Sequence, residues 1–148
     1  MLRCNKIISI KNIQLIVALI LFTFSFSKSW GQNIFSEGFA AGTTAPSGWT
    51  FTNIGGTYTT AGNYGVSSPS LKFDATGDRV VTQTFSCGDQ LSFWIKGQST
   101  NASSSFLVEG FDGTTWSTIS NIVPIPTTGT VYTYAISTSI IQIRFTYT

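Results

Sequence analysis

The chain has 148 residues, with eight Lys and Arg against six Asp and Glu, and it contains no histidine. Without histidine, neither a Ser-His-Asp nor a Cys-His catalytic arrangement can form, and histidine-containing zinc or iron sites are excluded as well. There is also no phosphate-binding loop and no dinucleotide-binding fingerprint. We therefore interpret the protein as non-catalytic, with no required cofactor.

Residues 1–31 have the three parts of a secretory signal peptide. Basic side chains at Arg3, Lys6 and Lys11 precede an apolar run over residues 13–26, and small residues at Ser29 and Gly31 define a cleavage site. The apolar run is shorter than the roughly 20 residues that span a bilayer. We expect cleavage before Gln32, no membrane span afterwards, and a location outside the cell or on its surface.

Residues 32–148 then form the mature part, which is long enough for one domain but not for two. It contains six carboxylates and four cationic side chains, so its net charge is −2. The cationic residues are Lys72, Arg79, Lys96 and Arg144. This composition has no basic patch for nucleic acid. Cys4 leaves with the signal peptide, and we interpret the remaining Cys87 as a small apolar filler near a turn.

Short runs of β-branched and aromatic residues alternate with polar ones along the mature chain, and turn residues separate them. The pattern predicts an all-β fold, an antiparallel β-sandwich of jelly-roll type. Loops are expected at 40–48 and 55–69, and a tight hairpin at Asp112-Gly113. The expected strands cover residues 33–39, 49–53, 70–75, 79–85, 90–96, 105–111, 115–119, 131–137 and 140–148.

Two of these runs show a clear register. In 90–96, Leu91, Phe93 and Ile95 share one face, which leaves Trp94 on the other face. Trp94 is therefore expected either to be exposed or to be covered by a loop or a neighbouring domain. In 140–148 the odd-numbered residues from 141 to 147 form the apolar face.

Several segments together resemble one known kind of extracellular module. They are NIFSEGF (33–39), PSGWTFTN (46–53), SLKFDATGD (70–78), LSFWIKG (91–97), VEGFDGTTW (108–116) and IQIRFTYT (141–148). The combination is similar to the choice-of-anchor J and cleaved-adhesin jelly-roll modules, which are distant relatives of MAM domains. These modules occur in secreted proteins of Gram-negative bacteria, commonly those that use type IX secretion. The resemblance implies further domains of the same polypeptide.

Related modules add one more strand after the segment that matches 141–148. The resemblance therefore implies a fragment that is incomplete at its C-terminus. A strand left without its neighbour exposes free backbone N–H and C=O groups, which promote association. The resemblance also places Glu37 near a structural Ca²⁺, with Asp74 as the only candidate partner here. The alternative for Glu37 is a solvated strand carboxylate.

Aromatic residues are the remaining candidates for ligand binding. Trp94, Trp116, Tyr58 and Tyr64 could stack on sugar rings or anchor a protein interface, whereas packing is the alternative for each of them. The favoured function is a non-catalytic binding or adhesion module that recognises a glycan or a cell-surface protein. The alternatives are a structural spacer and an accessory domain of a multidomain secreted enzyme.

Overall fold

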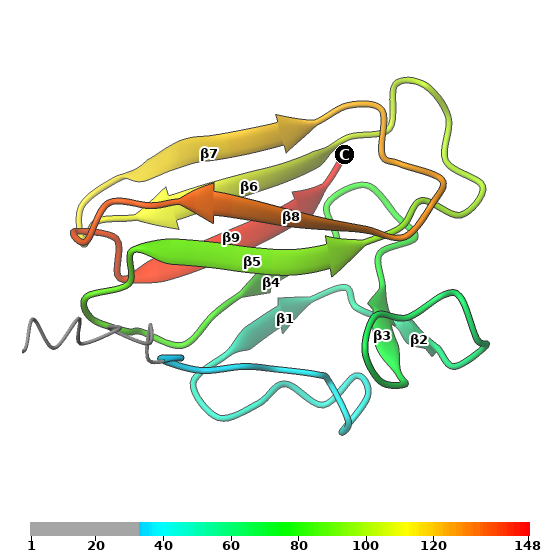
Figure 1. The fold of residues 1–148 in the computed structure, drawn as a ribbon, viewed down its shortest axis with the longest axis horizontal. Coiled ribbons are helices and arrows are strands. Elements are labelled where there is room, and N and C mark those ends of the chain that lie inside the picture. The colour runs from blue at the N-terminus through cyan, green and yellow to red at the C-terminus, as the bar shows by residue number, and fades with distance from the viewer. Residues whose placement is uncertain (1–32) are drawn as a thin grey trace, which may run out of the picture. The chain divides into compact units, whose positions relative to one another are not determined.

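The computed structural model describes residues 33–148, and the predicted signal peptide lies outside this range. The described part contains β-strands and no helix. Its nine strands are β1 (Thr50–Thr52), β2 (Gly56–Tyr58), β3 (Ser70–Lys72), β4 (Arg79–Val81), β5 (Gln90–Ile95), β6 (Phe106–Phe111), β7 (Trp116–Ile122), β8 (Thr130–Ala135) and β9 (Gln142–Tyr147) (Figure 1).

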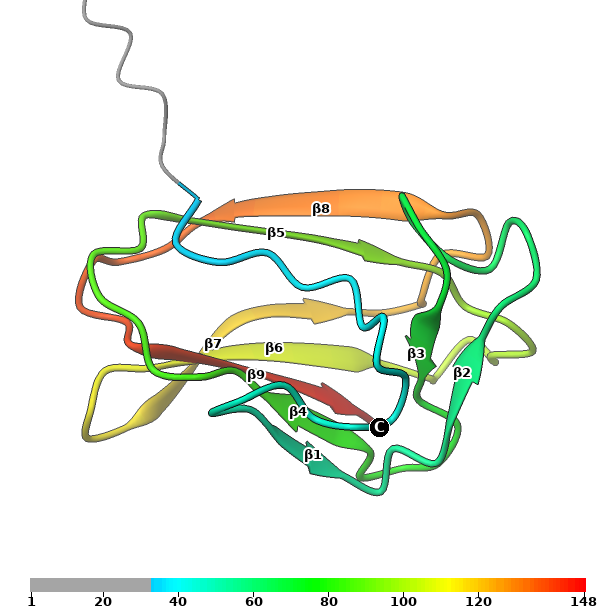
Figure 2. The same ribbon diagram turned by 90° about the horizontal axis from the view of Figure 1, so that it is seen from below.

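All strand pairs are antiparallel, and they form one large and two small sheets. The large sheet has five strands in the order β1-β4-β9-β6-β7, and the pairs β2-β3 and β5-β8 form the small sheets. Figure 2 shows β5 and β8 in one layer above the five-stranded sheet, with β2 and β3 at one end of the domain. The predicted all-β antiparallel architecture is confirmed, and the two facing layers are consistent with a β-sandwich.

The core lies between these layers and follows from the alternation of the sequence. On β9, Ile143 and Phe145 face the core, and Ile143 is almost completely buried. Phe93 and Ile95 on β5 contribute from the opposite layer, as predicted. β-Branched and aromatic side chains suit these positions because they pack well on a pleated surface. The buried apolar residues are Ile95, Phe106, Val108, Ile122, Ile125, Ile140 and Ile143.

The first predicted strand, 33–39, is not a strand in the structure. The segment is held by its side chains, because the ring of Phe35 lies 5.5 Å from that of Trp49 and 5.7 Å from that of Phe85. Phe39 adopts a positive φ of 56°, which interrupts extended geometry. Aromatic packing therefore anchors the segment where a ladder of backbone hydrogen bonds was expected.

The loop expected over 55–69 contains the short strand β2, in which Tyr58 pairs with Ser70 of β3. Thr57 and Tyr58 favour a strand, and pairing with β3 overrides the low strand propensity of Gly56. The interpretation of Cys87 as a small apolar filler was wrong, although the residue does lie in a turn. Cys87 is exposed and lies at a positive φ of 60° in the turn before β5.

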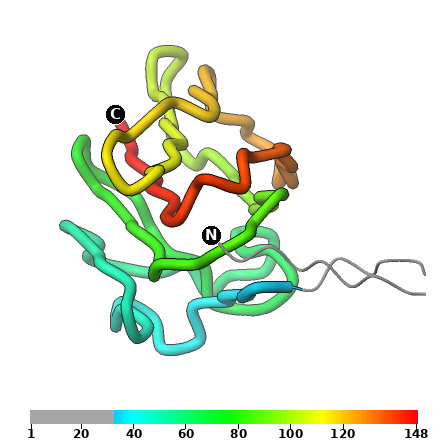
Figure 3. The backbone as a smooth tube through the Cα atoms, turned by 90° about the vertical axis from the view of Figure 1, so that its left-hand side faces the viewer, coloured from blue at the N-terminus to red at the C-terminus, as the bar shows by residue number. Residues whose placement is uncertain are grey.

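The last strand, β9, is central. It pairs with β4 on one side and with β6 on the other, so its backbone groups are used in both directions. The strands with a free side among the described residues are elsewhere: β1 and β7 at the margins of the large sheet, and the members of the two-stranded sheets β2-β3 and β5-β8. Figures 1 and 3 show the blue-to-cyan residues 33–60 and the yellow-to-orange strands β7 and β8 on opposite flanks.

Candidate functional site

Two neighbouring strands of the large sheet bring an ion pair to its outer face. Glu109 on β6 lies directly opposite Arg144 on β9. Arg144 Nε donates to Glu109 Oε2 at 2.7 Å, and its Nη2 donates to Oε1 at 2.8 Å. Only 22% of the Arg144 side chain and 12% of the Glu109 side chain are exposed. Two parallel charge-assisted hydrogen bonds hold both groups in one geometry.

Trp116 on β7 lies beside this pair. The guanidinium carbon of Arg144 is 4.2 Å from the centroid of the indole ring, which is a cation–π contact. Phe111, its partner across the β6–β7 ladder, stacks on the ring with a centroid distance of 5.0 Å and an interplanar angle of 27°. We call Glu109, Phe111, Trp116 and Arg144 the Trp116 cluster. Trp116 is half-buried in it, so its orientation is set before any ligand binds.

Trp94, the second predicted tryptophan, lies on the outer face of β5, where loops cover it. A Cβ atom built on Gly65 would come within 3.2 Å of Trp94 Cγ, and one built on Gly129 within 2.7 Å of its Nε1. Two glycine backbones therefore lie against the indole where larger residues would not fit. Of the alternatives expected for Trp94, the structure therefore shows the one in which loops cover the side chain.

Hydrogen bonds anchor the loop after β2, which contains the predicted residue Tyr64, to the end of β5 and to the start of β3. Lys96 Nζ donates to the carbonyl oxygen of Gly62 and to Asn63 Oδ1, both at 2.8 Å. The hydroxyl of Ser70, which pairs with Tyr58, donates to the carbonyl oxygen of Asn63 at 2.7 Å. Tyr64 follows Asn63 in this anchored loop. The next residue, Gly65, is one of the two glycines whose backbones lie against Trp94.

The two predicted calcium ligands are engaged with their own neighbours. Glu37 is exposed and accepts a hydrogen bond from the backbone N–H of Phe39 at 2.5 Å. Asp74 forms an ion pair with Lys72 at 2.6 Å, and the hydrogen bond from Lys72 lowers the pKa of this carboxyl. Within residues 33–148, no group of three or more His, Cys, Asp or Glu side chains is placed to hold a metal ion. The calcium site therefore stays a prediction.

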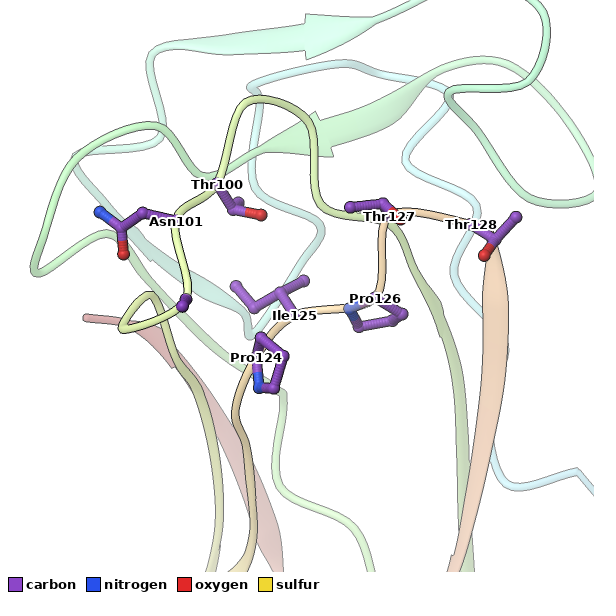
Figure 4. Close-up of a pocket in the computed structure, with 8 residues that line it drawn as sticks. Thr100, Asn101, Pro124, Ile125, Pro126, Thr127 and Thr128 are labelled. Carbon is purple, nitrogen blue, oxygen red and sulfur yellow. The ribbon is translucent and has the colours of Figure 1, made fainter.

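A hollow of about 410 Å³ opens between two loops at one end of the domain. Figure 4 shows Thr100 and Asn101 on one loop and Pro124, Ile125 and Pro126 on the other. The side-chain oxygen of Asn101 accepts hydrogen bonds from the backbone N–H groups of the two serines that follow Ala102. No ionisable side chain lines the hollow. Its polar groups mainly order the loops.

Sequence reasoning placed Trp116 among the candidates but missed Glu109 and Arg144. Asp112, in the predicted hairpin turn, is not part of this pair. Its Oδ1 accepts hydrogen bonds from the N–H groups of Thr114 and Thr115, both at 2.8 Å. The partner of Glu109 lies 35 residues further along the chain. In the sequence, only the alternation of apolar residues along β6 and β9 could have indicated that these two strands pair.

Comparisons with protein-family models, curated proteins and solved structures gave no match to this chain. Over residues 33–148, the structure has no helix with the length and apolar character needed to cross a membrane. The function is therefore argued from the residues of the site.

Proposed function

We propose that this domain is a non-catalytic binding module of an exported bacterial protein, with a jelly-roll-like sandwich as its scaffold. Its ligand is a glycan, which binds at the Trp116 cluster on the outer face of the large sheet. The predicted signal peptide supports export, and the absence of histidine supports a non-catalytic role. Further domains of the same polypeptide and an extracellular or cell-surface location belong to this proposal.

The Trp116 cluster is the observation that carries the proposal. Sugars present apolar C–H faces and a ring of hydroxyl groups, so a receptor needs an aromatic surface beside fixed polar groups. Trp116 supplies the ring, while Glu109 and Arg144 supply an acceptor and a donor whose positions are fixed by their mutual hydrogen bonds. The pair has no net charge, which favours a neutral glycan over an anionic one. Preorganised groups lose little conformational entropy on binding.

A spacer is the second candidate function. The contacts that fix Trp116 also stabilise the large sheet, because they join β6, β7 and β9. In a spacer or an accessory domain, the cluster would contribute to stability alone. The two candidates differ in one measurable respect, which is whether removing the indole changes binding beyond its effect on folding.

A glycan array and titration calorimetry test the proposal. Wild-type protein should bind a neutral glycan, and Trp116→Ala should weaken binding about fivefold, because aromatic stacking contributes on the order of 1 kcal/mol beyond the buried area. Trp116→Phe should retain part of the affinity. Tyr58→Ala is the control, since Tyr58 lies on β2 and is not part of the Trp116 cluster. A folded wild type that leaves the array blank would favour the spacer, as would a Trp116→Ala variant with unchanged affinity.

A further inference from the structure

The C-terminal third of the chain contains a long stretch without charge. No Asp, Glu, Lys or Arg occurs from Gly113 to Ile143, a range that includes β7 and β8 and the loops beside them. Exposed sheet edges in proteins are usually protected by charged side chains, proline, bulges or shortness, since a free edge can pair with another chain. No charged side chain on β7 or β8 protects the flank that these two strands form.

β8 is the edge with the least protection of any kind in the described part of the chain. It pairs with β5 through six consecutive residue pairs without a register shift, and it contains no proline. β7 differs because its pairing with β6 shifts between Val108 and Glu109, and β1, β2 and β3 differ because each has only three residues. β5 carries Lys96 just after its last residue. The side of β8 that faces away from β5 has no strand partner among residues 33–148.

The side chains of β8 show that this edge borders an incompletely covered core. Tyr132 and Tyr134 point inward and stack on Phe93 at centroid distances of 6.0 and 6.1 Å, yet both remain partly exposed. On the outer side, 63% of Val131 is exposed. In Figure 1, β7 lies beyond β8 at the upper margin of the domain, so the large sheet extends past the two-stranded layer there.

We propose that β8 is a homodimer interface, at which two copies of the chain pair their β8 strands antiparallel about a two-fold axis. The β5-β8 layers of the two copies then join into one four-stranded sheet. Two-stranded sheets are marginal in water, and three or more strands give independent stability. The added strand also covers the inward tyrosines of its partner and satisfies the free backbone groups.

Alternation limits the register of this pairing, because residues opposite one another must share a face. Centring the axis on Thr133 pairs Thr133 with Thr133 of the second copy, Tyr132 with Tyr134, and Val131 with Ala135. A second copy fits this edge because a two-fold interface is self-complementary, with the same residues of both copies meeting across it. A charged residue at the axis would face its own counterpart, and the uncharged stretch avoids that repulsion.

Analytical ultracentrifugation tests the dimer with the full chain produced in an exporting bacterial host. Wild type should show a reversible monomer–dimer equilibrium. Thr133→Lys and Thr133→Glu should each weaken the dimer about fivefold or more, since like charges oppose each other across the axis. An equimolar mixture of the two variants should restore association, because lysine then faces glutamate. Thr52→Lys is the control: it adds a charge to β1, an edge strand of the large sheet, and should leave the dimer unchanged.

Hydrogen exchange of the wild type gives a second readout that does not depend on the variants. Amides of residues 130–135 should exchange more slowly at high protein concentration than at low concentration, while those of β1 should not change. A wild type that stays monomeric at all concentrations would overturn the proposal. A dimer that neither charge variant weakens, a mixture that fails to reassociate, or unchanged exchange over 130–135 would also overturn it.

Discussion

Asp78 is buried completely, and replacing it with alanine should destabilise the domain more than any other change to a carboxylate. Its Oδ2 accepts hydrogen bonds from the backbone N–H groups of Asp74 at 2.7 Å and Ala75 at 2.9 Å. These bonds shape the turn between β3 and β4. The backbone carbonyl of Asp78 also accepts from the N–H of Tyr147 on β9, which connects the turn to the large sheet.

The magnitude follows from the groups that lose or gain a partner. Each hydrogen bond to an ionised acceptor contributes about 1.5–3 kcal/mol, so the two bonds to Oδ2 contribute about 3–6 kcal/mol. The other oxygen, Oδ1, is buried without a hydrogen-bond partner in residues 33–148, and alanine removes its desolvation cost of about 1–3 kcal/mol. We therefore expect Asp78→Ala to lower the free energy of unfolding by about 2–3 kcal/mol. For a domain of this size, the melting temperature should fall by about 10 °C.

Urea unfolding followed by tryptophan fluorescence, together with thermal unfolding by circular dichroism, measures this change. Asp78→Asn should cost less, about 1–2 kcal/mol, because its amide oxygen still accepts the two backbone bonds as a neutral group. Asp89→Ala is the matched control at an exposed aspartate and should stay within about 0.5 kcal/mol of wild type. An Asp78→Ala variant as stable as Asp89→Ala would refute the role given to the buried carboxylate.

Two further substitutions test other parts of the structure. Gly129→Ala should cost about 1–3 kcal/mol and shift the tryptophan emission, because its Cβ would lie 2.7 Å from Trp94 Nε1. Gly55→Ala is the control and should leave the emission unchanged, because its Cβ would come no closer than 4.0 Å to another atom, the carbonyl oxygen of Asn53. An unshifted spectrum for Gly129→Ala would mean that the loop does not cover Trp94. The Asp112 carboxyl should titrate by NMR below its ordinary pKa of 3.8, because the N–H groups of Thr115 and Thr114 stabilise its charged form. A lowered pKa means that its stabilisation is present above the unfolded-state pKa and is lost as pH falls through the folded-state pKa, so Asp112→Asn should reduce the loss of stability in acid. A midpoint at or above the ordinary value would contradict this.

Local chemistry in the sequence determined most of the strands and their buried faces. The alternation of Phe93 and Ile95 with Trp94 placed the first two in the core and the third outside it, as the structure confirms. The Asp112-Gly113 hairpin was predictable for the same reason. Gly113 adopts a φ of 97°, and the Asp112 side chain accepts the backbone hydrogen bonds of the turn. These features depend on residues close together in the chain, so one segment contains the whole signal.

Strand order and the partners of single side chains were decided only by the tertiary structure. Glu109 finds Arg144 because β9 lies beside β6, and Trp94 is covered because Gly65 and Gly129 come from two separate loops. Segment 33–39 has strand-like composition, yet aromatic contacts hold it without a ladder. In each case the deciding interaction joins residues far apart in sequence, and its free energy depends on which surfaces meet when the layers pack. Periodicity within a segment reports which side of a strand is apolar, whereas the neighbour of that strand depends on how the whole chain closes around its core.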